Sequence, residues 1–414
     1  MKDTLLITPK ATNKAISPYV AQINDNPSVP KISSQGSLES STNNVAAISP
    51  QRSANYRKKH KLKQLGLQTG RQKYCGTPAD YYVGLGNKTN CHNTAGLQGV
   101  HRCGSVWSCP VCRQVILKRR QEEVNIHGEY LQGKFGSDLK TTMLTLTMPH
   151  KRKDNLGDLI GSSKDKKGLM GALRFMRSSR AWRKFKAEIG LVSDIRAVEV
   201  TYGNNGFHPH LHLMIYHIGN FTHEAHVSKV YDMWSNALIK CGSPPSDIKA
   251  IDISDFSNKS ATYIVSWGAS SEIVGQDVKG AKSGSVSINQ LESIVCAGEA
   301  DNRHISALKE YYETMKGKRL ISYNGIKPPK TETDAEIMKS EDKETDFVER
   351  FLIDKHQYRL IEKKGMVYKL LELLQVYDDA GLQKLVHDIT GRSLFIRDKQ
   401  TGKVVQYQQG VSNE

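Results

Sequence analysis

The sequence predicts an α+β protein built around an antiparallel sheet with helices on one face. Three observations predict this fold class. Between residues 138 and 325, short segments of alternating apolar and polar residues are separated by longer segments with helical periodicity. Their order is strand, helix, strand, strand, helix, strand, helix, as in a split βαβ sheet. The two middle strands meet at an Asn- and Gly-rich turn, which is typical of a hairpin.

The first strand is predicted at residues 141–148. Leu144 and Leu146 alternate there with Thr145 and Thr147, so one side of the strand is apolar and the other is polar. This alternation is typical of a strand that is buried on one face only.

A helix is predicted next, at about residues 164–189. One flank of this helix carries Arg174, Arg177, Arg180 and Arg183, which recur at every third position. Such a flank is often simply solvated. Beside a nucleic-acid site, however, it would hold backbone phosphates, and we expect that role here.

The central hairpin is predicted to pair residues 194–202 with residues 206–215. If Asn204 and Asn205 form a two-residue loop, Glu199 lies directly opposite His210, with their Cβ atoms about 5 Å apart. A three-residue turn would shift the pairing by one residue and direct Glu199 to the other face.

Three imidazoles alternate along the second strand of this hairpin, at His208, His210 and His212. In an extended strand they all point to one face, where they offer the ligands of a divalent cation. His210, His212 and Glu199 are the predicted ligands, and His208 is the histidine least expected to bind. The alternative is a solvated His-rich strand. The opposite face has an apolar layer formed by Val198, Val200, Leu211, Leu213 and Ile215.

Three further elements follow the hairpin and complete the series. They are a helix at about residues 222–239, a strand near residues 248–253 and a helix from about residue 257.

The composition favours a polyanionic partner. The chain has 59 Lys and Arg against 42 Asp and Glu, which gives a net charge of +17 and a pI of about 9.4. Nucleic acid is the simplest such partner, and a solvated basic surface without a partner is the alternative.

The 414 residues are enough for two or three domains. Residues 1–65 are polar and basic, with no signal peptide or membrane segment, so we expect a disordered tail on a cytoplasmic protein. The later divisions are a Cys-rich module at 66–125, the sheet domain at 138–325, an acidic linker at 326–345 and a small helical appendage at 346–414, which ends in a short hairpin.

Five of the seven cysteines lie between Cys75 and Cys112, in a chain without an export signal, which disfavours disulfides. The spacing of Cys103, Cys109 and Cys112 ends in a Cys-x-x-Cys knuckle, which is typical of a structural Zn²⁺ site. Cys75 is the favoured fourth ligand.

Three other residues remain open as the fourth ligand, namely Cys91, His92 and His101. Clustering without any metal is the competing interpretation of the cysteines. The helix predicted after Cys112 carries Arg113, Lys118, Arg119 and Arg120, which we expect to face phosphates.

Three segments, taken together, resemble the ordered motifs of the HUH endonucleases. They are Leu144-Thr-Leu-Thr-Met-Pro-His150, Phe207-His-Pro-His-Leu-His212 and the predicted helix Lys259-Ser-Ala-Thr-Tyr263-Ile-Val-Ser266-Trp267. Within these enzymes the chain is most similar to the rolling-circle replication initiator (Rep) proteins of plasmids, including a Cys-rich segment before the first motif. The resemblance extends from about residue 75 to residue 325.

The resemblance implies a ferredoxin- or RRM-like sheet and a nicking and joining reaction. Tyr263 would attack a phosphodiester of single-stranded origin DNA, forming a 5′-phosphotyrosine and freeing a 3′-hydroxyl primer. Mg²⁺ or Mn²⁺ held by His210, His212 and Glu199 would polarise the phosphate. The same transfer, reversed, would rejoin the displaced strand. The implied partners are origin DNA and the host DNA polymerase and helicase, and a homo-oligomer is an open alternative.

The chain departs from this family at two positions around Tyr263. Related initiators often have a lysine three residues after the tyrosine, where this chain has Ser266, and some have a glutamate four residues before it, where this chain has Lys259. We hypothesise that Lys259 supplies the missing cation from the preceding helical turn. The missing glutamate leaves open how replication ends, and a second tyrosine transfer is one route.

Other functions compete with replication initiation. A transposase or relaxase would use the same residues on different DNA. A metal oxygenase or cupin-like protein would need iron and a small-molecule pocket, for which the net charge and the tyrosine motif give no reason. A zinc-containing DNA-binding regulator would bind DNA without nicking it.

Overall fold

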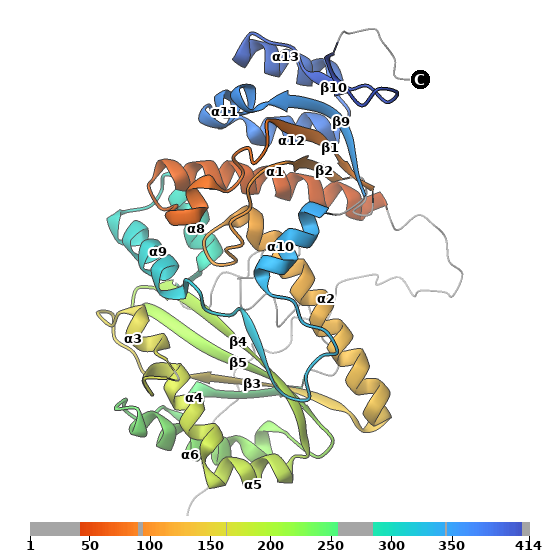
Figure 1. Cartoon of the computed structure of the whole chain (residues 1–414). Coiled ribbons are helices and arrows are strands. Elements are labelled where there is room, and N and C mark those ends of the chain that lie inside the picture. The colour runs from red at the N-terminus through yellow and green to blue at the C-terminus, as the bar shows by residue number, and fades with distance from the viewer. Residues whose placement is uncertain (1–41, 90–93, 163, 256–284, 344–345, 408–414) are drawn as a thin grey trace, which may run out of the picture. The chain divides into compact units, whose positions relative to one another are not determined.

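The computed structural model describes five stretches of the chain, which are residues 42–89, 94–162, 164–255, 285–343 and 346–407 (Figure 1). Their elements form two antiparallel sheets surrounded by helices. This confirms the α+β class. Among the described residues, no helix is both long enough and apolar enough to span a bilayer.

The larger sheet is the central sheet predicted from the sequence. Its strands lie in the order β6-β3-β5-β4-β7, and β8 also pairs with β4, all antiparallel. Its strands are β3 (Lys140–Thr147), β4 (Leu191–Gly203), β5 (Gly206–His217), β6 (Ile251–Asp255), β7 (Val286–Ser287) and β8 (Ile321–Gly325).

The β4–β5 hairpin has the predicted two-residue loop. Gly203 pairs with Gly206, and Glu199 pairs with His210. Gly206 has φ +82°, and a Cβ atom there would lie 2.9 Å from the carbonyl oxygen of Arg152. Glycine therefore satisfies both the turn and the close approach of a neighbouring segment, and it fixes the register of the strands.

The apolar layer of this sheet is buried as predicted: Val198, Val200, Leu211, Leu213 and Ile215 are all at most 5% exposed. Helices cover this face. They are α4 (Gly168–Ser178), α5 (Arg180–Glu188) and α6 (His223–Lys240), with the short α3 (Leu156–Ile160) beside α4.

Two contacts from α4 identify the face that it covers. Arg177 pairs with Asp194, and Met170 contacts Arg196. Because Asp194 lies opposite Ile215 on the strand pair, α4 packs on the apolar side.

The prediction of one helix over residues 164–189 is wrong, because the chain breaks between α4 and α5. Ser179 is extended, with φ −72° and ψ 154°, and its hydroxyl accepts a hydrogen bond from the backbone N–H of Trp182. A serine at this position begins a new helix, since its side chain satisfies one of the unpaired N–H groups of the first turn. The predicted strand near 248–253 also begins later, because residues 248–250 form a 3₁₀ turn before β6.

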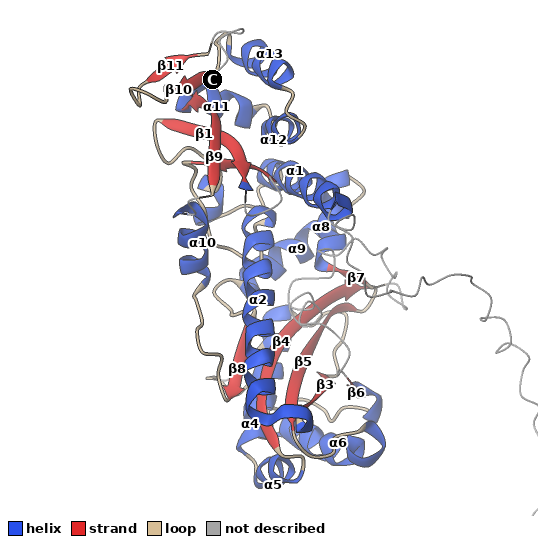
Figure 2. Cartoon of the chain, turned by 90° about the vertical axis from the view of Figure 1, so that its right-hand side faces the viewer, coloured by secondary structure: helices blue, strands red, loops and turns tan. Residues whose placement is uncertain are grey.

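The opposite face of the sheet is covered in part by α2 (Pro110–Phe135), which runs along β4 and β5 in Figure 2. The buried His127 of α2 hydrogen-bonds through Nε2 to Ser193 Oγ at 3.1 Å, and its ring meets Tyr216 edge-on at 5.5 Å. Ser193 pairs with Tyr216, so α2 occupies the end of the face farthest from the hairpin turn. Glu199, His210 and His212 lie toward the other end.

The smaller sheet shows that residues 346–414 are not a separate appendage. Its order is β11-β10-β9-β1-β2, so β9 lies beside a strand from the predicted Cys-rich module. Gly86 of β1 lies so close to the Val348 carbonyl that a side chain would collide with it. Contacts so distant in sequence leave no local pattern. Its strands are β1 (Tyr82–Lys88), β2 (Thr94–Gln98), β9 (Phe347–Asp354), β10 (Phe395–Arg397) and β11 (Val404–Gln406).

The predicted C-terminal helices and end hairpin are present around this sheet. The helices are α11 (Lys355–Lys363), α12 (Val367–Gln375) and α13 (Asp379–Thr390), and β10 pairs with β11 as the hairpin.

Two segments assigned to disorder or to a linker are ordered helices. Helix α1 spans Thr42–Gln64 and buries Tyr56 and Leu62, so the predicted tail is wrong for residues 43–64, which belong to the compact unit that begins at Asn43. The sequence of α1 has few apolar residues among many basic ones, so its pattern did not predict a packed helix. Helix α10 spans Asp334–Lys343 in the predicted linker and packs on α2.

Two further helices complete the described fold, α8 (Ile288–Ala297) and α9 (Asn302–Met315). They begin at the N-caps Ser287 and Asp301, whose side chains accept hydrogen bonds from the first-turn backbone. The helix predicted from about residue 257, with Lys259 and Tyr263, lies outside the described residues.

Candidate metal centres

The hairpin brings Glu199, His210 and His212 together at one point of the sheet. Each offers one ligand atom, and these atoms all lie within 4.8 Å of one another. His212 Nε2 lies 2.9 Å from Glu199 Oε2, and the His210 and His212 rings stack at 5.9 Å. The geometric part of the prediction is therefore confirmed. That these residues, called the triad below, bind an ion stays a prediction.

The electrostatics of the triad suit a cation. Burial raises the pKa of the Glu199 carboxyl, but the hydrogen bond from His212 and the nearby imidazoles outweigh it and lower the pKa overall. Burial lowers the pKa of His210 to about 4. Near neutral pH the site therefore presents an ionised carboxylate and a neutral imidazole, the protonation states that a metal ligand needs.

Thr145 supports the triad from the neighbouring strand, a role that the sequence analysis missed. It pairs with His212 across β3 and β5, and its Oγ1 lies 3.1 Å from His212 Nδ1. With Nδ1 held in this way, Nε2 is directed toward Glu199 and toward an ion between them. The alternating threonines of β3 were the available signal, but they indicated a polar face without naming a partner.

His208 stands beside the triad without joining it. Its ring lies 4.3 Å from that of His210 on one side and 4.6 Å from that of His150 on the other. Among the described residues, the group that can share an ion contains His210 and His212 but not His208, as the sequence analysis expected.

The second candidate centre is formed by Cys75, Cys103, Cys109 and Cys112. Their sulfur atoms all lie within 4.8 Å of one another, and three of the pairs are 3.5 to 3.7 Å apart. All four are free thiols. Sulfurs at the corners of a tetrahedron with Zn–S bonds of about 2.3 Å would be roughly 3.8 Å apart, so the geometry fits zinc.

Cys75 is the fourth cysteine of this cluster, as favoured from the sequence. His101 is not part of the group, and Cys91 and His92 lie outside the described residues. Cys75, Cys109 and Cys112 are at most 1% exposed, so four thiolates would surround an ion completely. The arrangement suits a structural site with no open position for a substrate.

A buried lysine accompanies the cysteines. Lys59 of α1 donates a hydrogen bond to the carbonyl oxygen of Cys75. Burial alone would lower the pKa of Lys59, but the charges of Cys75 and Cys109 and other neighbours raise it overall. A cation at this position would offset part of the charge of the thiolates of a zinc site.

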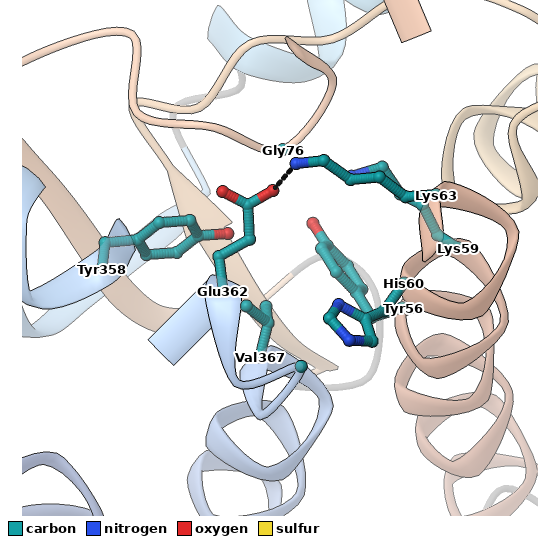
Figure 3. Close-up of a pocket in the computed structure, with 9 residues that line it drawn as sticks. Tyr56, Lys59, His60, Lys63, Gly76, Tyr358, Glu362 and Val367 are labelled. Carbon is teal, nitrogen blue, oxygen red and sulfur yellow. Dashed lines mark hydrogen bonds and ion pairs between the residues drawn. The ribbon is translucent and has the colours of Figure 1, made fainter. Parts of the chain in front are cut away.

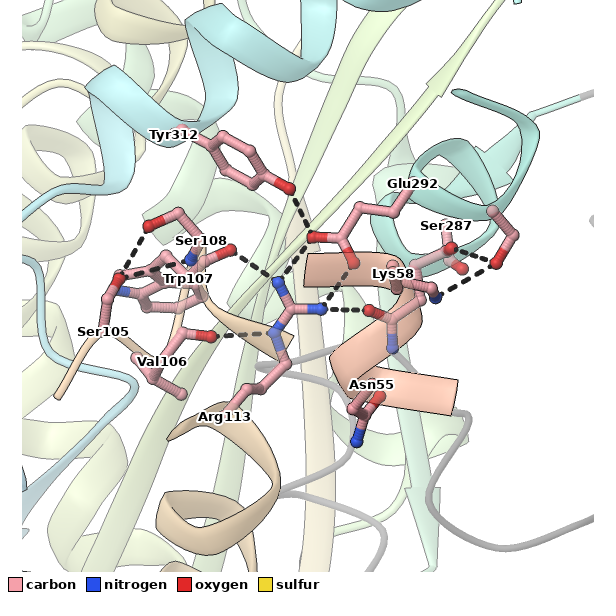
Figure 4. A network of polar contacts seen from close by, with 12 residues as sticks. Asn55, Lys58, Ser105, Val106, Trp107, Ser108, Arg113, Ser287, Glu292 and Tyr312 are labelled. Carbon is pink, nitrogen blue, oxygen red and sulfur yellow. Dashed lines mark hydrogen bonds and ion pairs between the residues drawn. The ribbon is translucent and has the colours of Figure 1, made fainter. Parts of the chain in front are cut away.

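Arg113 is the clearest error in the predicted DNA-binding set, because it is buried in a polar network (Figure 4). Its guanidinium pairs with Glu292 at 2.6 and 2.9 Å and donates to the carbonyl oxygens of Val106 and Trp107. Glu292 also accepts a hydrogen bond from Tyr312. Arg113 therefore fastens the cysteine knuckle to α8 and α9 and has no donor left for a phosphate.

Two other predicted phosphate ligands are also engaged in ion pairs. Arg120 pairs with Glu123 and, at 2.7 Å, with Asp334 of α10, and Arg177 pairs with Asp194. The three-residue spacing of arginines did not reveal these carboxylates, because two of the three partners are distant in sequence.

The remaining predicted phosphate ligands are accessible. Arg119 is partly exposed and lies 3.3 Å from Glu122, while Arg174 and Arg180 are exposed. The last two lie on α4 and α5, on the face opposite the triad. Their contact with DNA stays a prediction.

A small pocket lies between α1 and α11, beside the segment that carries Cys75 and away from the triad (Figure 3). Lys63 and Glu362 form a 2.8 Å ion pair at its edge, and the Tyr56 and Tyr358 side chains lie beside them. Its inner volume of about 20 Å³ matches a single water molecule, so it is too small for a nucleotide.

A family model described as Replication protein matches residues 95–364. Two curated relatives are a Protein rep from Streptomyces lividans and a Neomycin resistance protein from Streptomyces cyanogenus. No solved structure matches the chain.

Both relatives match over part of their length. The first is 32% identical over 143 residues, which is 30% of this chain and 31% of the relative. The second is 32% identical over 138 residues, which is 28% of this chain and 30% of the relative. The chain thus spans about a third of the length of either one.

Proposed function

The chain belongs to the replication protein family, and from this premise we propose that it is a plasmid rolling-circle replication initiator that nicks and rejoins origin DNA. Its implied partners are single-stranded origin DNA and the host polymerase and helicase that extend the primer. The single observation that carries the proposal is the triad, because it gathers two imidazoles and a carboxylate on a sheet face within reach of a polyanion.

The ligand set defines what an ion could do here. Three protein ligands leave positions open for phosphate oxygens, so Mn²⁺ or Mg²⁺ at the triad would act as a Lewis acid on the scissile phosphate. The two nitrogen ligands favour Mn²⁺, since Mg²⁺ prefers oxygen. Zn²⁺ at the four cysteines would have a structural role.

Tyr263 is the proposed nucleophile. Its phenol oxygen would form a bond to phosphorus while the bond to the 3′-oxygen breaks. The phenol proton would pass to solvent or a neighbouring base, and a proton from solvent would complete the 3′-hydroxyl. The order β6-β3-β5-β4 with antiparallel neighbours is that of the split βαβ sheet, which supports the HUH assignment.

The position of β6 is compatible with such a nucleophile. It ends at Asp255 opposite Thr142, while Thr145, beside His212, lies three residues farther along β3, or about 10 Å away. Tyr263 follows Asp255 by eight residues, and a chain segment of that length is long enough to cover this distance. We propose Lys259, one turn earlier, as the cation that assists the phenol.

The decisive experiment is a covalent-adduct assay. Purified protein is incubated with Mn²⁺ and single-stranded origin DNA labelled on the 3′ side of the nick, which is the side that stays attached to the protein, and the labelled protein is resolved on a denaturing gel. We expect an adduct that Tyr263→Phe abolishes, because the substitution removes only the attacking oxygen. Tyr231→Phe, on α6, is the matched control.

Two outcomes would overturn the proposal. Binding without any adduct would favour a zinc-containing regulator, and an adduct that survives Tyr263→Phe would move the nucleophile elsewhere. Strand transfer between excised element ends would instead favour a transposase.

A further inference from the structure

A segment outside the predicted site lies next to the triad. Strand β3 ends at Thr147, which pairs with His210, and the chain then continues to His150. The ring of His150 packs on that of His208, which packs on that of His210, at 4.6 and 4.3 Å. A row of imidazoles thus leads from this segment to the triad.

The hairpin turn holds the segment in place. The backbone of Arg152 contacts Gly206 so closely that a Cβ atom there would lie 2.9 Å from its carbonyl oxygen and 3.3 Å from its Cα. The side chain of Asp154 accepts a hydrogen bond from the backbone N–H of Lys151 at 2.7 Å. The segment is therefore positioned by the same turn that sets the register of the triad.

The chemistry of the segment is that of a phosphate site. Lys151, Arg152 and Lys153 are exposed, and with Asp154 they give three positive charges against one negative charge. The Nδ1 atom of His150 is buried and has no hydrogen-bond partner among the described residues. A buried ring nitrogen normally has a partner, and a rotation of the half-buried ring would let an oxygen of a bound strand supply one.

We propose that His150, Lys151, Arg152 and Lys153, together with His208, form a phosphate track that guides single-stranded DNA onto the triad. The inference rests on the proposed function and adds a binding surface to it. A second metal ion is the less favoured ligand. Among the described residues, the only groups of three or more metal-binding side chains are the triad and the cysteine cluster, and three cations adjoin His150.

The experiment compares two charge-removal variants. The track variant carries Lys151→Gln, Arg152→Gln and Lys153→Gln. The control carries Lys184→Gln on α5 with Lys229→Gln and Lys240→Gln on α6, which are also exposed but lie on the helices of the opposite face. Affinity for a fluorescent single-stranded oligonucleotide is measured over a salt series with zinc-loaded protein carrying Tyr263→Phe and without added Mn²⁺ or Mg²⁺, so that neither cleavage nor the triad metal contributes while the structural zinc is retained.

We expect the track variant to bind at least about 10-fold more weakly and to reduce the slope of log affinity against log salt by roughly 2, as for three lost phosphate contacts. The control is expected to change affinity less than about 3-fold. His150→Ala, which removes no lysine or arginine, should weaken binding with little change of slope. Thermal unfolding checks that each variant is folded.

Parent-like affinity and slope in the track variant, or an equal loss in the control, would overturn the inference. Two Mn²⁺ ions per parent chain, one of them lost in His150→Ala, would also overturn it in favour of a second cation. The adduct assay separates the two proposals. If the parent forms the Tyr263 adduct while the track variant binds normally, only the track fails, whereas the absence of any parental adduct removes the proposed function.

Discussion

The two candidate metal centres differ in how completely protein ligands would surround an ion: the cysteine cluster is a closed site, and the triad is an open site. The cysteine cluster has four thiols, three of them at most 1% exposed, and is surrounded by α1, α2 and the Arg113 network. The triad has three ligands, of which Glu199 and His210 are only half-buried. Four buried sulfur ligands leave an ion nothing else to bind, whereas three ligands on an accessible face leave positions for a phosphate. The difference separates a site that stabilises the fold from a site that does chemistry.

Helix α2 connects the two regions. It begins at its N-cap Cys109, inside the closed cluster, and places His127 against the sheet that carries the triad. Disturbing the closed site should therefore affect folding, and disturbing the open site should affect reaction with little effect on folding. The predictions below test this contrast in order of expected effect.

The largest effect is expected from the closed site. Cys109→Ser with Cys112→Ser should remove zinc and destabilise the protein by more than about 5 kcal/mol, because binding energy at a structural zinc site is folding energy. Zinc content by atomic emission and calorimetric unfolding measure both. Cys241→Ser with Cys296→Ser is the matched control, and zinc retention in the first variant would contradict the assignment.

The second effect concerns the ion pair that anchors the cluster. Arg113→Met leaves Glu292 buried without its cation and should cost about 3 to 5 kcal/mol of unfolding free energy. Arg119→Met, on the same helix but in a partly exposed pair, should cost less than about 1 kcal/mol. Urea unfolding compares the two variants. Equal costs would show that Arg113 does not anchor the knuckle.

The third effect belongs to the open site. His210→Ala should slow adduct formation about 100-fold or more, which corresponds to roughly 3 kcal/mol of transition-state stabilisation. Its unfolding free energy should fall by less than about 1.5 kcal/mol, since the ring is only half-buried. His223→Ala, exposed at the start of α6, is the control. Unchanged adduct rates would place the ion elsewhere.

The smallest effect is a pH dependence of the unfolding free energy caused by His127, on the helix α2 that connects the two centres. Burial lowers the pKa of His127 to about 4, below the value of about 6.5 expected in the unfolded chain. As the pH falls from about 6.5 to about 4, His127 takes up a proton in the unfolded chain before it does so in the folded protein. The unfolding free energy that His127 contributes above a pH of about 6.5 is therefore lost. Between pH 7 and 4.5 the loss should be about 2.5 kcal/mol.

His127→Phe should reduce this pH dependence, because phenylalanine cannot titrate. Urea unfolding at the two pH values measures the difference between the parent and the variant. Parallel pH profiles would mean that His127 is not the group responsible.

Local patterns allowed the hairpin and its triad to be predicted from the sequence. The two-residue turn fixes the register, and the register alone places Glu199 opposite His210. The knuckle likewise indicated three of its four cysteines. The predictions that were wrong concern residues whose partners lie far along the chain. Arg113 pairs with Glu292, 179 residues later, and β1 pairs with β9.

Two further errors have local causes that composition conceals. Helix α1 buries few apolar side chains among many charged ones, so it looks like a solvated tail. The break at Ser179 depends on one capping serine within a continuous helical pattern. The track residues after β3 were missed because their significance comes from packing against Gly206 and His208, not from their own spacing.

The most direct test of the open site is manganese binding followed by electron paramagnetic resonance, on the zinc-loaded parent and on His210→Ala with His212→Ala. We predict one tightly bound Mn²⁺ per parent chain, and its loss in the variant while zinc and the fold are retained. Equal Mn²⁺ binding by the two proteins would contradict the assignment of Glu199, His210 and His212 as the metal centre for nicking.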